Sequence, residues 1–165
     1  MPIVDTLLPE FDHEMTTTRK LLERVPEDRL SWKPHVKSMS LGGLATHLSN
    51  LPWWGLMTVT QPEFDLATSD RQEAASSRAQ ILETFDRNVA ATRAALDGKS
   101  DAELMAPWSL RRGGQTIFSM PKAAVWRSFM LSHLVHHRGQ LSVYLRLLDV
   151  PVPSVYGPSA DEGGL

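Results

Sequence analysis

Three histidines stand close together in residues 132–140, Ser-His-Leu-Val-His-His-Arg-Gly-Gln. Two of them, His133 and His137, are four positions apart, which on an α-helix is a rotation of about 40° and a rise of about 6 Å. Their imidazoles therefore leave the same face of a helix, one turn apart. Two imidazoles in this arrangement can bind one metal ion. His136, three positions after His133, is the alternative partner.

The helical face that carries these histidines helps to choose between the alternatives. With about 100° of rotation per residue, an apolar stripe lies within about 60° of His133. Its members are Trp126, Phe129, Met130, His137, Gln140, Tyr144, Leu147 and Leu148, and the opposite side carries Ser128, Arg138, Ser142 and Arg146. We therefore predict that the helix buries its histidine pair, and we favour His137 over His136. Hydrogen-bonded core histidines without a metal remain the alternative.

A third candidate ligand lies on the helix predicted over residues 41–59. His47 shares one face of this helix with apolar residues and so points inward. These neighbours are Leu44, Leu51, Trp54 and Thr58. Taken alone, His47 is better interpreted as a satisfied core histidine. Taken with His133 and His137, it becomes the third ligand of a metal site.

Composition limits the chemistry and the partners. The chain has 165 residues, a formal net charge of −2 and no cysteine, so any metal must be held by nitrogen and oxygen ligands. No run of Lys and Arg indicates binding to nucleic acid or to an anionic membrane surface. The chain begins without a signal peptide and has no apolar run of about 18 residues, which predicts a cytoplasmic protein. Its length predicts a single domain, residues 1–165.

Four amphipathic segments predict an all-α fold, a four-helix bundle. Apolar residues recur at helical spacing over residues 3–25, 41–59, 71–96 and 121–148. Pro52 should bend or break the second helix, because it removes one backbone hydrogen bond. Residues 99–120 lack a helical period and predict a long crossover between the third and fourth helices. Gly113-Gly114 is the expected turn of a short hairpin there.

Three stretches resemble the DinB/YfiT family of metal-binding four-helix bundles. They are Leu-Ala-Thr-His-Leu at 44–48 with Trp53-Trp54, His-Leu-Val-His-His-Arg-Gly-Gln-Leu at 133–141, and Val-Tyr-Gly-Pro-Ser at 155–159. The resemblance implies that His47, His133 and His137 bind zinc, nickel or another divalent ion. It also implies an up-down-down-up bundle that forms a homodimer. An apolar strip of Leu131, Leu134 and Val135 is compatible with such a dimer.

The resemblance further implies an enzyme acting on a small-molecule substrate. Three neutral imidazoles leave one position of the ion open, where water or a thiolate can bind. A low-molecular-weight thiol as cosubstrate, in a transferase or isomerase, is the reaction that the family implies first, with metal-dependent hydrolysis as the alternative. A non-catalytic, metal-stabilised bundle related to stress and a metal-free bundle are hypotheses of another class.

The sequence assigns no catalytic residue. Gln140 and Tyr144 lie on the face of the histidines and are candidate contacts to a ligand or substrate, although packing roles explain them equally well. Glu14 has little support as a base. An open metal position that faces a cleft lined by Trp54, Trp126 or Tyr144 would favour a substrate, whereas a sealed position would favour a structural ion.

Overall fold

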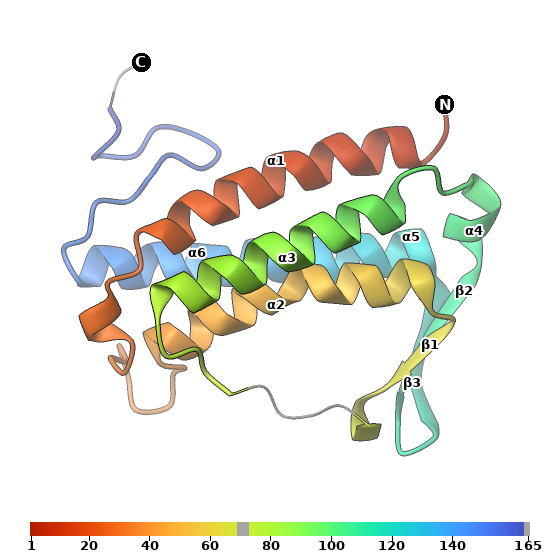
Figure 1. The fold of residues 1–165 in the computed structure, drawn as a ribbon, viewed down its shortest axis with the longest axis horizontal. Coiled ribbons are helices and arrows are strands. Elements are labelled where there is room, and N and C mark those ends of the chain that lie inside the picture. Colours follow the sequence, from red (N-terminus) through yellow and green to blue (C-terminus); the bar gives the residue numbers. More distant parts are fainter. Residues whose placement is uncertain (69–72, 164–165) are drawn as a thin grey trace.

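The computed structural model describes residues 1–68 and 73–163, and its long helices form a bundle (Figure 1). They are α1 (Val4–Glu23), α2 (Leu41–Thr60), α3 (Arg78–Leu96) and a last helix in three consecutive parts. These parts are α5 (Lys122–Val125), the π-helical segment η3 (Trp126–Leu131) and α6 (Ser132–Leu147). The predicted all-α four-helix bundle is confirmed.

The helices follow the up-down-down-up order that the resemblance implied. The helix α1 and the last helix run in one direction, and α2 and α3 run in the other (Figure 1). Because α2 and α3 are parallel, the connection over residues 61–77 must bring the chain back along the bundle. The predicted long connection between α3 and the last helix contains α4 (Asp101–Met105), β2 (Pro107–Arg112) and β3 (Gln115–Pro121).

A small sheet closes the end of the bundle where α3 ends. Strand β1 (Glu63–Asp65) pairs in parallel with β2, and β2 pairs with β3 in an antiparallel hairpin. Gly113 and Gly114 have φ angles of 58° and 80°, which confirms the predicted hairpin turn. The carboxylate of Asp65 accepts hydrogen bonds from both glycine N–H groups, at 2.9 and 2.7 Å, and so ties β1 to the turn.

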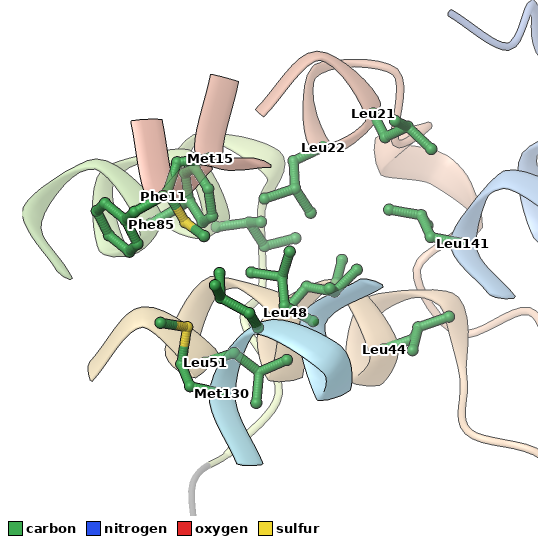
Figure 2. Packing of buried hydrophobic residues seen from close by; sticks show 14 of the residues in the cluster. Phe11, Met15, Leu21, Leu22, Leu44, Leu48, Leu51, Phe85, Met130 and Leu141 are labelled. Atoms are coloured by element: carbon green, nitrogen blue, oxygen red, sulfur yellow. The ribbon is translucent and has the colours of Figure 1, made fainter. Parts of the chain in front are cut away.

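The core forms where the apolar faces of the helices meet (Figure 2). Buried side chains from all four helical segments contribute to one cluster, as the helical spacing predicts. Its labelled members are Phe11, Met15, Leu21, Leu22, Leu44, Leu48, Leu51, Phe85, Met130 and Leu141. This core fixes the helix α2 between α3 and the last helix.

Pro52 does not break α2, so the predicted break is wrong, and the predicted bend stays a prediction. The helix continues from Leu41 to Thr60. Helix α3 supplies hydrogen bonds to the carbonyl groups near the proline: Asn88 Nδ2 donates to the Ser49 carbonyl at 3.0 Å, and Thr92 Oγ1 donates to the Pro52 carbonyl at 2.7 Å. These tertiary bonds hold α2 against α3 on both sides of the missing backbone bond from position 52.

Helix α3 begins at Arg78, later than the predicted start at residue 71. Residues 71 and 72 lie outside the described residues, and residues 73–77 are not helical. The start is fixed by Ser77, whose side chain accepts a hydrogen bond from the Gln80 N–H at 3.1 Å. Before it, the Ala75 N–H donates to Thr46 Oγ1 at 2.8 Å, which holds this segment against α2.

The last helix is rotated relative to the prediction. Its buried side chains on α6 are Leu134, Arg138, Leu141 and Leu145, whereas His133 and His137 are half-buried at the edge of this face. The π-helical segment η3 contributes to the error, because a π turn contains more residues than the 3.6 assumed for the apolar stripe. The prediction that the histidines lie in the middle of the buried face is therefore wrong.

Arg138, predicted on the outer side of the helix, is only 1% exposed. Its guanidinium lies 2.6 Å from a carboxylate oxygen of Glu14, which is itself 8% exposed. It also donates a hydrogen bond to the Tyr156 hydroxyl at 2.5 Å, and that hydroxyl donates to Glu14 at 2.9 Å. Burial of the arginine is possible because its charge is paired and hydrogen-bonded.

The apolar strip that was compatible with a dimer is largely used inside the chain. Leu131 and Leu134 are 4% and 0% exposed and belong to the core, while Val135 is half-buried. The strip therefore no longer supports a second copy, and the homodimer stays a prediction. Among residues 1–68 and 73–163, no helix combines the length and the apolar character that a membrane span requires.

A methyl group at Gly55 should destabilise the bundle. A Cβ atom there would lie 2.9 Å from Thr92 Cγ2, 3.0 Å from Trp126 Cζ3 and 3.2 Å from Met130 Cε. We expect Gly55→Ala to lower the free energy of unfolding by about 1–3 kcal/mol, because the three neighbours must move. Urea unfolding of the variant and the wild type measures this difference.

The control is Gly139→Ala, in the middle of α6. A Cβ atom at Gly139 would meet no atom of the described chain within 4 Å. Alanine should raise the stability there by about 0.5–1 kcal/mol through its higher helix propensity. Equal effects of the two substitutions would contradict the close approach at Gly55.

Candidate metal centre

The three predicted ligands come together between α2 and α6. His47 Nε2 lies 3.2 Å from His133 Nε2, and His133 Nε2 lies 2.8 Å from His137 Nε2. One ligand atom from each of the three side chains lies within 4.8 Å of the others, and all three residues are half-buried. This group could hold a metal ion.

His136 does not join this group. Its side chain is exposed, and its Nε2 lies 3.2 Å from Gln140 Nε2. The favoured pair of His133 and His137 is therefore the one that converges with His47. His13 and His35 likewise lie outside the cluster.

Gln140 determines which nitrogen of His137 carries the proton. Its Oε1 lies 2.7 Å from His137 Nδ1, while its Nε2 points to His136. Since an amide oxygen can only accept, Nδ1 of His137 must be the donor. The Nε2 of a neutral His137 then presents a lone pair towards His133.

The backbone of Phe129, one turn earlier, acts on His133 in the opposite sense to burial and raises the pKa of its imidazole. The Nε2 atom of His133 faces both other rings, at 3.2 Å from His47 Nε2 and 2.8 Å from His137 Nε2. The lone pair on His137 Nε2 can therefore be satisfied by an N–H of His133 or by a cation that the nitrogens share.

The spacing of the nitrogens fits one ion. Two imidazole nitrogens bound to tetrahedral zinc at about 2.0–2.1 Å lie about 3.3 Å apart. The observed separations of 3.2 and 2.8 Å are close to this value. Three ligands would leave the fourth tetrahedral position free, as in catalytic zinc sites.

Burial keeps the imidazoles in the form that binds metals. Together with the neighbouring His137 and His133, it lowers the pKa of His47 to about 4. Burial also lowers the pKa values of His133 and His137 below their ordinary range. All three rings are therefore neutral at neutral pH, which is the protonation state that binds metals.

An aromatic wall borders the histidines on the side of the small sheet. The Phe129 ring lies 6.1 Å from that of His133, and the Trp54 ring lies 5.3 Å from that of Phe129. Phe64 of β1 continues the wall at 4.9 Å from Trp54. Trp54 is thus connected to His133 through the ring of Phe129.

Two other candidate lining residues have structural contacts. Trp126 is completely buried and packs against Phe11 with ring centroids 5.4 Å apart, so it does not line a cleft. Tyr144 packs edge-on against Trp32 at 5.6 Å and donates a hydrogen bond to the Met39 carbonyl at 3.3 Å. Glu14 is bound to Arg138, on another face of α6.

Comparison with known families agrees with the fold and with the motif. The sequence profile described as the DinB family matches residues 1–163. The chain belongs to the DinB family. Within the family, it is 24% identical over 159 residues to the uncharacterized protein YrdA of Bacillus subtilis (strain 168), covering 96% of this chain and 91% of YrdA.

Two crystal structures of DinB-like proteins share the fold of this DinB chain. One is from Bacillus cereus ATCC 10987, with a TM-score of 0.73, 24% identity, and coverage of 92% of this chain and 97% of that one. The other is YjoA from Bacillus subtilis, with a TM-score of 0.67, 18% identity, and coverage of 96% and 99%. At these identities the likeness shows the fold alone.

The neutral histidines predict a pH dependence for the metal-free protein. The pKa of His47 is about 4 in the folded chain and 6.5 ordinarily, so below pH 6.5 the unfolded chain binds a proton that the folded chain does not. Stability should therefore fall as the pH drops from about 6.5 to about 4. After allowance for solvent screening, His47 should contribute about 1 kcal/mol to this loss.

Urea unfolding of EDTA-treated protein at neutral pH and near pH 5 tests this effect. The comparison is with His47→Gln, which has no titrating ring and should lose less stability on acidification. An equal loss in the variant and the wild type would contradict the role assigned to His47.

Proposed function

We propose that this DinB protein, as one domain of residues 1–165, is a metal-dependent enzyme. His47, His133 and His137 bind one divalent ion, zinc or nickel, through their Nε2 atoms. The observation that carries the proposal is the convergence of the three Nε2 atoms: His133 Nε2 lies 2.8 Å from His137 Nε2 and 3.2 Å from His47 Nε2, close to the spacing of two imidazole nitrogens on one zinc ion.

The reaction that we propose is a transfer or isomerisation that uses a low-molecular-weight thiol. When bound, the ion would supply Lewis acidity at its open position, where a thiol ionises to the reactive thiolate. A thiolate needs no separate base once it is formed, and among the described residues the cluster contains histidines without a carboxylate. This donor set supports thiol chemistry over a reaction that requires a carboxylate base at the ion.

The residues of the chain would orient the ligands. Gln140 would hold the Nδ1–H group of His137, so that its Nε2 atom faces the ion. The aromatic wall of Trp54 and Phe129 lowers the water content on one side of the site, which strengthens electrostatic interactions there. The substrate is a small molecule, and the homodimer and the cytoplasmic location stay predictions.

Metal content of the wild type and of histidine variants tests the site. We expect about one zinc or nickel per chain in untagged protein purified without added metal. His47→Ala, His133→Ala and His137→Ala should each lose it, because two imidazoles alone hold the ion weakly. His136→Ala, the matched control, should retain it.

Elemental analysis gives the stoichiometry, and circular dichroism shows whether each variant is folded. Loss of metal from His136→Ala with retention in His137→Ala would overturn the ligand assignment. No metal in the wild type, even after incubation with divalent ions, would leave a metal-free helical bundle.

Cobalt-loaded protein separates thiol chemistry from its alternatives. We expect 2-mercaptoethanol to produce a sulfur-to-cobalt charge-transfer absorption band, because the thiolate enters the open position. No band together with hydrolysis of an activated ester would favour the metal-dependent hydrolase. If neither the thiol nor azide or cyanide binds to the cobalt, the result would favour a non-catalytic, metal-stabilised bundle.

A further inference from the structure

A small cavity opens directly beside His47. Its volume is about 190 Å³, and the described residues that line it are Met39, Gly43, Thr46, His47 and Ala74. Met39 and Ala74 are exposed, so the outer rim of the cavity can be reached from solvent, whereas Thr46, on α2, is buried. The cavity thus leads from the surface to one ligand of the candidate metal centre.

The lining residues make this cavity apolar and uncharged. Thr46 is polar, but its Oγ1 already accepts the hydrogen bond from the Ala75 N–H at 2.8 Å. Met39, Gly43 and Ala74 bring no polar or charged side chain to the lining. An apolar group can therefore occupy the cavity, because it would not remove a charged side chain from water.

The volume limits the size of the occupant. A space of about 190 Å³ corresponds to about six water molecules, at about 30 Å³ each. It is smaller than the 300 Å³ or more that is typical of sites for drug-sized ligands. A short aliphatic chain or a single ring fits these dimensions.

The charge of the metal centre determines which kind of atom should bind at its open position. Three neutral imidazoles leave the two positive charges of a divalent ion uncompensated, and the described members of the cluster include no carboxylate. In a half-buried site this charge favours an anionic atom at the fourth position. The same ligand would then present an anion to the ion and an apolar body to the cavity.

Gly43 is the residue that leaves the cavity open. A Cβ atom at the neighbouring Gly42 would lie 3.0 Å from the Leu30 carbonyl oxygen and 3.1 Å from Leu30 Cβ, so that glycine is needed for packing. A Cβ atom at Gly43 would meet only Ser40 Oγ, at 3.1 Å, in the described chain. Larger side chains at position 43 would therefore extend into the space beside His47.

We propose that this cavity binds the apolar body of a small anionic ligand whose charged donor atom occupies the open position of the metal. The inference rests on the proposed metal site and adds to it the class of molecule that the site accepts. Gly43 acts as a specificity-determining residue, because its missing side chain provides the room.

Two hydroxamates of similar acidity test the inference on the cobalt-loaded protein. Acetohydroxamate and butanohydroxamate bind metals through the same group and differ by two methylenes. Each buried methylene should add about fourfold to the affinity, so butanohydroxamate should bind about fifteenfold more tightly. Titration followed by the visible absorption of cobalt gives both dissociation constants.

Gly43→Met should remove this preference by filling the cavity, while it retains cobalt and binds acetohydroxamate within about threefold of the wild type. Gly139→Met, on the side of α6 away from the histidines, is the matched control and should keep the preference. If Gly43→Met fails to fold, Ala74→Phe replaces it, because Ala74 lies in an exposed segment that is not helical. This variant should also lose the preference for butanohydroxamate.

The outcomes separate this inference from the proposed function. Equal affinities of the two hydroxamates in the wild type, or an unchanged preference in the folded position 43 or 74 variant, would overturn the inference while leaving the metal site intact. Failure of the wild type to bind cobalt, or of cobalt to bind either hydroxamate, would overturn the open metal site and the inference with it.

Discussion

The buried ion pair between Arg138 and Glu14 fixes the rotation of the last helix. Two charges removed from water are stable only when they are paired and hydrogen-bonded, and removal of one partner costs about 3–5 kcal/mol. A rotation of α6 that moved the histidine pair to the centre of the core would carry Arg138 away from Glu14. Since Arg138 directly follows His137, the pairing holds the histidines at the edge of the bundle, where they face His47 on α2.

The same network also connects α6 to the C-terminal segment of the chain. The Tyr156 hydroxyl accepts a hydrogen bond from Arg138 and donates one to Glu14, and the Arg138 guanidinium lies 4.9 Å from the centre of the tyrosine ring. Burial and the neighbouring carboxylate raise the pKa of Tyr156, so it stays a donor at neutral pH. Two of the stretches that resemble the family, 133–141 and 155–159, are therefore joined in one structural unit.

Helical spacing predicted the bundle and the convergence of the three histidines, because both depend on local periodicity. It did not predict the position of Arg138, since a charge is assigned to the outer face unless its partner is known, and Glu14 lies 124 residues away. Nor did it predict an intact helix at Pro52, which depends on hydrogen bonds from α3. The π-helical segment Trp126–Leu131 had no signal in the spacing, and it changed the register on which the rotation was based.

An edge position satisfies two opposing requirements of a reactive metal site. A fully buried site would have to remove a divalent ion and its fourth ligand from water, at a large desolvation cost, and would exclude a substrate. A fully exposed site would leave the imidazoles with ordinary pKa values and free to rotate. Half-burial, together with the neighbouring His137 and His133, lowers the pKa of His47 to about 4, while Gln140 orients the His137 ring. The rotation set by Arg138 therefore provides both neutral, oriented ligands and a path from solvent to the open position.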